Sequence, residues 1–164
     1  MPGKRSILLL LALTAATQSA AAQSRFAVHL FGLSYHYKSR TYRDWYGNLR
    51  HYEQVNVGVG AEYLMRSTDR TLISFDAGAY RDSKDRLNVF AGPAMRLKFG
   101  THLLAGAGVV LLTSRTYGTP IAPLPVVTAR WGWVALNGTW MPSLDSRESG
   151  AVAMFGTVYL PRRE

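Results

Sequence analysis

The chain of 164 residues contains no cysteine, so its fold must rest on backbone pairing and packing without any disulfide bond. Acidic residues are also scarce, with 10 Asp and Glu against 19 Lys and Arg, and the formal net charge is +9. Beyond the first 22 residues no apolar run approaches the roughly 20 residues that a membrane helix needs. These absences argue against a disulfide-stabilised scaffold and against a bundle of membrane helices.

The first 22 residues have the pattern of a secretory signal. Lys4 and Arg5 precede an apolar stretch centred on 7–13, and small residues close the segment at Ala20–Ala22. This order matches the basic, apolar and cleavage regions of an export signal. We therefore expect residues 1–22 to be removed and residues 23–164 to form one domain. An N-terminal membrane anchor is the alternative.

The basic charge allows several partners. No nucleic-acid-binding motif is present in the sequence, so we expect no nucleic-acid partner. An anionic lipid surface fits better, because Lys and Arg near a membrane attract phosphate groups. The charge alone is equally compatible with a purely solubilising role.

Alternation of apolar and polar residues is the main structural signal. In residues 53–65 the apolar side chains fall on one face and Gln54, Asn56 and Glu62 fall on the other, as in a β-strand. The same alternation recurs along the chain, and helical periodicity is absent. The predicted strands are 26–37, 53–65, 71–82, 86–98, 102–113, 120–130, 133–141 and 150–160.

Long strands in even number favour a barrel over a soluble sandwich, whose strands are usually shorter. Charged residues such as Glu62, Arg96 and Lys98 lie on the polar faces, which suits the lumen of an outer-membrane barrel with an apolar exterior. We predict an all-β fold, an eight-stranded antiparallel up-and-down transmembrane β-barrel. Short and long connections alternate, so the long ones should lie outside, with His36, Asp82-Ser83 and Arg115 at the external rim.

Glycines are frequent on the faces that should point inward. They are Gly58, Gly60, Gly78, Gly92, Gly106 and Gly108. An eight-stranded barrel has room inside for side chains or for one small ligand, so these glycines predict a slender pocket open to the outside. Alternatively, the glycines relieve strand bending and allow the barrel to close.

The ordered motifs resemble one known family. They are YHYKSR (35–40), YRDSKDR (80–86), FAGPA (90–94), GAGVVLLTSRTYGTPIAPLPV (106–126) and RWGWVALNGTWMP (130–142). With their shared placement at the outer rim, they resemble the lipid A palmitoyltransferases of the PagP type, eight-stranded barrels of the Gram-negative outer membrane. The resemblance covers most of the mature chain at low overall identity.

The resemblance implies transfer of a palmitoyl-like chain from a phospholipid to lipid A in the outer leaflet, by a membrane-embedded monomer without cofactor or metal. It implies catalytic roles for His36, Asp82 and Ser83 and substrate-binding roles for Arg115, Gly92 and Ala94. The family's glycine at the pocket floor falls on Ala94, close to the inward Gly92, which leaves the acyl length open. Pro142 matches a proline thought to let lipid enter from the side, and a second such gap falls near Pro123 and Pro125.

The chemistry of these residue types is consistent with acyl transfer, which needs a proton acceptor and stabilisation of an oxyanion. His36 is the natural base, Ser83 a nucleophile or a positioning group, and Asp82 an orienting acid. No G-x-S-x-G motif is present, which argues against an ordinary hydrolase fold. The alternatives are that Asp82-Ser83 merely form a turn, that the barrel is non-enzymatic, or that water replaces lipid A as acceptor.

Overall fold

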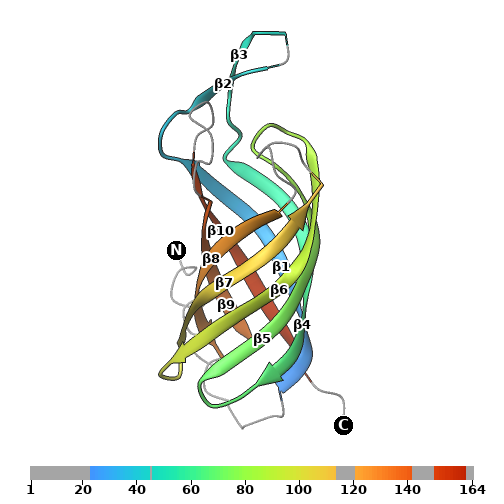
Figure 1. Ribbon diagram of the computed structural model, residues 1–164, viewed down its shortest axis with the longest axis vertical. Coiled ribbons are helices and arrows are strands. Elements are labelled where there is room, and N and C mark those ends of the chain that lie inside the picture. The colour runs from blue at the N-terminus through green and yellow to red at the C-terminus, as the bar shows by residue number, and fades with distance from the viewer. Residues whose placement is uncertain (1–22, 45, 114–120, 142–149, 162–164) are drawn as a thin grey trace, which may run out of the picture.

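The computed structural model describes residues 23–44, 46–113, 121–141 and 150–161. Within these ranges the chain is all β, and eight of its strands form a closed antiparallel barrel in which β1 pairs with β10 (Figure 1). The barrel strands are β1 (Gln23–His36), β4 (Val55–Ser67), β5 (Thr71–Arg81), β6 (Leu87–Phe99), β7 (Leu103–Leu112), β8 (Ile121–Trp131), β9 (Val134–Met141) and β10 (Ala151–Pro161). No helix in the described ranges is long and apolar enough to cross a membrane.

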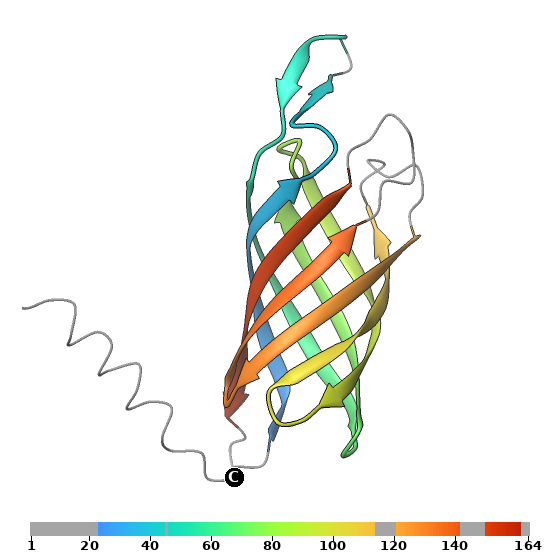
Figure 2. The same cartoon turned by 90° about the vertical axis from the view of Figure 1, so that its left-hand side faces the viewer.

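The predicted strands are confirmed, with bounds that differ by no more than three residues. The largest difference is at the start of β1, which begins at Gln23 because it pairs there with Pro161. One element was not predicted. The connection between β1 and β4 contains a small hairpin of β2 (Thr41–Arg43) and β3 (Leu49–His51), which projects beyond the barrel (Figure 2).

The connections distinguish the two ends of the barrel. The β4–β5, β6–β7 and β8–β9 connections are short and lie at one end, which we call the turn end. Gly100 and Gly132 form two of these turns with φ of 70° and 59°, a backbone conformation that glycine adopts without steric cost. The hairpin lies at the opposite end, which we call the hairpin end (Figure 2).

The alternation predicted for β4 is confirmed by burial. Val55 and Val57 point outward and are 60% and 67% exposed, whereas Asn56 and Glu62 point inward and are 7% and 1% exposed. The exterior carries large apolar side chains around the barrel, among them Leu30, Met95, Val109, Val127, Leu136 and Met154.

A bulge in β1 changes which residues of that strand face the lumen. The register with β10 and β4 shifts between Phe31 and Leu33, and His29 before it and His36 after it are both buried. The extra residue of a bulge moves the following side chains to the other face. The bulge therefore brings His36 inward, where strict alternation from His29 would point it outward.

The interior is layered along the barrel axis. Near the turn end, small apolar clusters fill the lumen: Leu64, Leu72 and Leu104 in one, and Ala27, Ala135 and Tyr159 in another. A belt of buried polar residues lies at mid-height, and above it the half toward the hairpin end contains a cavity. The cavity is therefore closed below and open toward the hairpin end.

Candidate functional site

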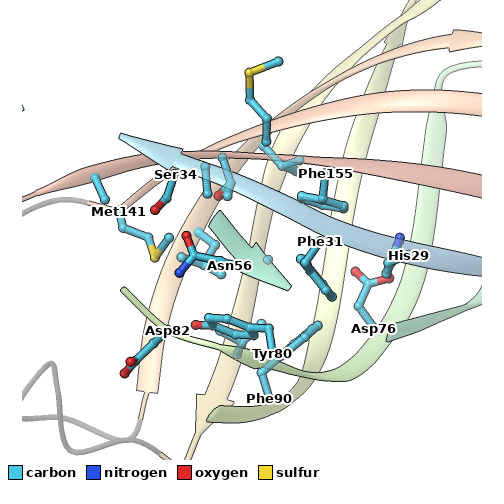
Figure 3. Close-up of a pocket in the computed structure, with 18 of the residues that line it drawn as sticks. His29, Phe31, Ser34, Asn56, Asp76, Tyr80, Asp82, Phe90, Met141 and Phe155 are labelled. Atoms are coloured by element: carbon cyan, nitrogen blue, oxygen red, sulfur yellow. The ribbon is translucent and has the colours of Figure 1, made fainter. Parts of the chain in front are cut away.

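The cavity has a volume of about 1040 Å³, counted with its open mouth. Its mouth is lined by Ser34, Asp82 and Ser83, and its inner end by His29, Asp76 and Arg96. The walls between are mainly apolar, with Val110, Leu112, Leu124, Val126 and Met141 among them. Figure 3 shows this arrangement, with Ser34, Asp82 and Met141 at one end and His29 and Asp76 at the other.

Aromatic rings occupy part of the cavity wall at mid-height. Phe31 lies at the centre, with its ring centroid 5.6 Å from Tyr80, 5.5 Å from Phe90 and 5.1 Å from Phe155. Such tilted and edge-on contacts stabilise the rings as a group. The four rings line the passage from the mouth of the cavity to its inner end.

Ala94 and Gly108 line this passage on the neighbouring strands. They face each other in the β6–β7 register, and a Cβ added at Gly108 would lie 3.4 Å from the Cβ of Ala94. Ala94, the residue predicted at the pocket floor, is thus part of the cavity wall and is buried. The small size of both residues keeps the passage open.

The other inward glycines have a different role. A Cβ at Gly92 would collide with the carbonyl oxygen of Val109, one at Gly106 with that of Met95, and one at Gly58 with Tyr80. These glycines therefore permit close approach of neighbouring strands, in agreement with the alternative of bending and closure. Gly92 is not among the described residues that line the cavity, whereas Gly108 is.

The polar belt below the cavity is a connected network. Arg96 Nη2 donates to Glu62 Oε2 at 2.9 Å and to Ser74 Oγ at 3.0 Å. His29 Nδ1 lies 2.8 Å from Thr157 Oγ1, which also accepts a bond from Asn137. Buried ion pairs persist where further hydrogen bonds satisfy them. The belt supplies part of those bonds, and among the described residues Glu62 Oε1 and Arg96 Nε are buried without a hydrogen-bond partner.

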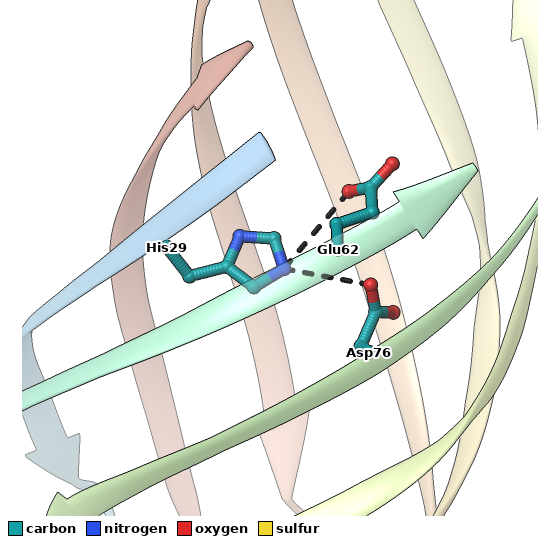
Figure 4. A group of neighbouring side chains, drawn as sticks. All are labelled: His29, Glu62 and Asp76. Carbon is teal, nitrogen blue, oxygen red and sulfur yellow. Dashed lines mark hydrogen bonds and ion pairs between the residues drawn. The ribbon is translucent and has the colours of Figure 1, made fainter. Parts of the chain in front are cut away.

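Three side chains of the belt are arranged as metal ligands could be. The ligand atoms of His29, Glu62 and Asp76 lie within 4.8 Å of one another (Figure 4). The guanidinium of Arg96, however, lies 2.9 Å from Glu62 and 3.8 Å from Asp76, so a positive charge already serves both carboxylates. The group thus already contains its own cation, and we interpret it as an ion-pair network.

Asp82 builds the turn that follows β5. Its Oδ1 accepts hydrogen bonds from the backbone N–H groups of Lys84 and Arg86, both at 2.9 Å, and Asp85 in the same turn has φ of 58°. An Asp side chain commonly stabilises a turn in this way. Asp82 is also buried and lines the cavity, so the turn holds a carboxylate at the mouth.

Ser83 belongs to a group of polar side chains at the cavity mouth. Its Oγ lies 3.2 Å from Ser34 Oγ and 3.5 Å from Asn56 Nδ2. Alternation predicts Asn56 on the polar face of its strand, but it indicates no functional role for Ser34 or Asn56. Ser34 could not be found by alternation, because the bulge at mid-strand sets its direction.

His36 lies at the same end of the barrel as Ser83, because Ser34, two residues before it, contacts Ser83. Its ring is buried and stacks on Tyr52. Unlike Asp82 and Ser83, His36 is not among the described residues that line the cavity. The structure therefore brings the three predicted catalytic residues to one end, two at the cavity mouth and one in an aromatic stack beside it.

The hairpin beside the site is held by its own turn. Asp44 Oδ1 accepts bonds from the backbone N–H groups of Tyr46 and Asn48, at 3.0 and 2.9 Å. Partial desolvation raises the pKa of the Asp44 carboxyl, but the bonds from Asn48, Arg50 and Tyr46 outweigh it and leave the pKa lowered.

Arg115 and Pro142, for which the resemblance implies roles in substrate handling, lie outside the described residues.

One side of the barrel is incompletely paired near the hairpin end. The β8–β9 register runs from Trp131–Val134 to Val126–Thr139, although β8 continues to Ile121 and β9 to Met141. Pro123 and Pro125 pair with β7 but lie in the part of β8 that is not paired with β9, where proline has no N–H to donate. The hydroxyl of Thr139 on β9 donates to the Pro125 carbonyl at 2.8 Å at the edge of this segment. The cavity wall beside Val126 and Met141 thus lies next to an opening in the hydrogen-bond ladder.

Comparison with protein-family models and with curated proteins gave no match.

Proposed function

We propose that this protein is an outer-membrane acyltransferase that moves a fatty acyl chain from a phospholipid to lipid A. The observation that supports it most is the apolar cavity whose mouth is lined by Ser83 and Asp82, at the barrel end that also carries His36. An acyl chain would lie in the cavity, and its ester would lie at the mouth among these polar groups.

Membrane insertion is part of the proposal. The apolar exterior, with side chains such as Val57, Met95 and Val109 more than half exposed, favours contact with lipid tails over contact with water. A closed barrel leaves no unpaired strand edge, as a membrane requires. The predicted export signal is consistent with location in the outer membrane.

The proposed reaction is a transesterification. His36 takes the proton of a lipid A hydroxyl, and the oxygen attacks the carbonyl carbon of the phospholipid ester. The hydroxyls of Ser83 and Ser34 are the donors for the oxyanion. The amide of Asn56, which donates to the Arg81 carbonyl and to Ser83 Oγ, positions Ser83. As the tetrahedral intermediate collapses, the carbon–oxygen bond to the phospholipid breaks, and the proton passes to the departing lysophospholipid.

Lipid entry through the wall is consistent with the pairing. The segments of β8 and β9 that are not paired with each other adjoin the cavity lining at Val126 and Met141. A phospholipid whose chain passes between these strands would reach the cavity without leaving the membrane. Its headgroup would stay at the hairpin end.

A non-enzymatic barrel is the second candidate, and one observation favours it. Asp82 Oδ1 is used by the turn, which would explain the acid without catalysis. The deciding experiment expresses the wild type and His36→Ala in a strain without such an enzyme and compares lipid A by mass spectrometry. The wild type should add one fatty acyl mass and the variant none, and identical spectra would reject the enzyme. Release of free fatty acid without a heavier lipid A would indicate an esterase.

A further inference from the structure

We propose that the cavity binds a hydroxylated acyl chain, apolar along most of its length and carrying a hydroxyl near its inner end that donates to Asp76. The inference rests on the proposed function, since it names the class of acyl chain that the cavity takes. It follows from the hydrogen bonds of the polar belt, which are longer at Asp76 than at Glu62.

Asp76 is the weakly bonded member of that belt. Its nearest polar partners are His29 Nε2 and Ser74 Oγ, each at 3.4 Å, and Arg96 Nη2 at 3.8 Å. Charge-assisted hydrogen bonds are usually about 2.7–2.9 Å long. Glu62 Oε2 has such a bond from Arg96, at 2.9 Å, and its other oxygen, Oε1, has no partner but is sealed from the cavity, since the Glu62 side chain is 1% exposed. The Asp76 carboxylate therefore retains acceptor capacity that its neighbours do not use.

The unused capacity faces the cavity. Asp76 points into the lumen and lines the inner end of the cavity, and its side chain is 15% exposed, whereas Glu62 is 1% exposed. In Figure 3 the Asp76 carboxylate lies beyond Phe31 as seen from the mouth. A guest that passes the aromatic cluster thus meets a carboxylate at the end of an apolar channel.

A plain methyl end fits this position poorly. It would displace water from the carboxylate and provide no hydrogen bond in return, which is unfavourable for a charged group. A hydroxyl would donate a short bond to the carboxylate. A terminal carboxylate would be repelled, because Glu62 and Asp76 outnumber Arg96 in the contacts that the belt makes.

The channel admits such a chain beside the aromatic cluster. Ala94 and Gly108 face each other across β6 and β7 and line the cavity with Asp76 and Arg96. A Cβ at Gly108 would be in ordinary contact with the Ala94 Cβ, at 3.4 Å, and a larger side chain there would extend into the cavity that both residues line. The route to Asp76 therefore depends on two small residues.

The test is binding by the folded barrel, in a detergent whose cyclic tail cannot enter the channel. The probes are saturated fatty acids of increasing length and their matched ω-hydroxy and (ω−1)-hydroxy acids. At the length that reaches the belt, the hydroxy acid should bind about tenfold more tightly than the plain acid. Equal or tighter binding of the plain acid at every length would overturn the proposal.

Variants tie the preference to the carboxylate. Asp76→Val leaves Glu62 and Arg96 as a neutral pair, and it should bind plain chains more tightly than hydroxy chains. Asp76→Asn keeps an acceptor oxygen, so it should retain a reduced hydroxyl preference. It tests the assignment if the Asp76→Val barrel does not fold. Asp85→Asn, an exposed acid in the β5–β6 turn, is the matched control and should leave the preference unchanged. A hydroxyl preference that survives Asp76→Val in a folded barrel contradicts the assignment.

Transfer assays separate this inference from the proposed function. Phospholipids with plain and with hydroxylated chains are offered as donors to the same preparation. Efficient transfer of plain chains, with no hydroxyl preference in binding, would overturn the inference and leave the acyltransferase standing. Preferential binding of hydroxy chains without transfer from either donor would overturn the acyltransferase and leave the inference standing.

Discussion

His36 and Tyr52 stack face to face, with ring centroids 3.9 Å apart and an angle of 8° between the rings. Tyr52 in turn contacts Tyr42 at 4.9 Å, and Lys84 Nζ lies 5.4 Å from the centroid of the Tyr42 ring. These contacts run from the end of β1, through the hairpin, to the residue after Ser83. The hairpin is thereby connected to both segments that carry the predicted catalytic residues.

The stack predicts that Tyr52 positions His36. Tyr52→Ala should lower the rate of acyl transfer about tenfold or more, because the imidazole would no longer be held in one orientation. Tyr52→Phe keeps the stacking face and should retain most of the rate. Lipid A acylation over time, measured by mass spectrometry, gives the rates. Tyr46→Ala, at a hairpin residue that is 87% exposed, is the control, and an equal loss in the alanine and phenylalanine variants would contradict the positioning role.

The two hydroxyls at the cavity mouth should differ in importance. Ser83→Ala should reduce transfer about 100-fold or more if the hydroxyl bonds the reacting ester. Ser34→Ala, which removes the partner 3.2 Å away, should cost much less. Initial rates with a radiolabelled phospholipid donor check the prediction. Wild-type activity in Ser83→Ala would place the chemistry elsewhere.

Two substitutions of Asp82 should affect stability and activity differently. Asp82→Asn keeps a side-chain oxygen that can accept the bonds from Lys84 and Arg86, so the free energy of unfolding should change little. Its activity should still fall about 100-fold if the charge of the carboxylate takes part. Asp82→Ala should also lose about 1–2 kcal/mol of stability, because both turn bonds lose their acceptor. Urea unfolding in lipid or detergent measures the first quantity, and full activity of Asp82→Asn would reduce Asp82 to a turn residue.

The buried pair of Glu62 and Arg96 makes a prediction about stability alone. Arg96→Met should destabilise the barrel by about 3–5 kcal/mol, because Glu62 and Asp76 would remain buried without their cation. Glu62→Gln should cost less, since Arg96 still faces Asp76 at 3.8 Å. Breaking the exposed Arg81–Asp85 pair should change stability by less than about 1 kcal/mol. Unfolding in urea ranks the three variants. A larger loss of stability in Glu62→Gln than in Arg96→Met would contradict the explanation by unpaired buried charge.

The opening between β8 and β9 predicts an effect of cross-linking. The chain has no cysteine, so Pro125→Cys and Trp140→Cys would form one defined pair, at positions that would face each other if the ladder continued beyond Val126–Thr139. A short cross-link there should reduce transfer about tenfold, and reduction should restore it. The control pair is Leu111→Cys and Ile121→Cys, across the paired β7–β8 ladder, which should leave transfer unchanged. Inhibition by both pairs would point to general rigidification.

The sequence determined the barrel because strand alternation is a local property. Val55, Asn56 and Val57 alternate in the sequence as they do in the structure, and the same pattern predicted all eight barrel strands. The short β2–β3 hairpin was missed, since strands of three residues carry too little alternation to be recognised.

Only the tertiary structure decided which residues meet. A bulge that the alternation does not reveal brings Ser34 and His36 inward. Tyr52 stacks on His36 because the chain returns to the end of β1 after the β2–β3 hairpin. The inward glycines looked alike in the sequence, yet Gly108 lines the cavity while Gly92 lies against the Val109 backbone. Local patterns fix the direction of a side chain only within a regular strand, whereas its direction after a bulge and its contacts with distant residues depend on register and closure.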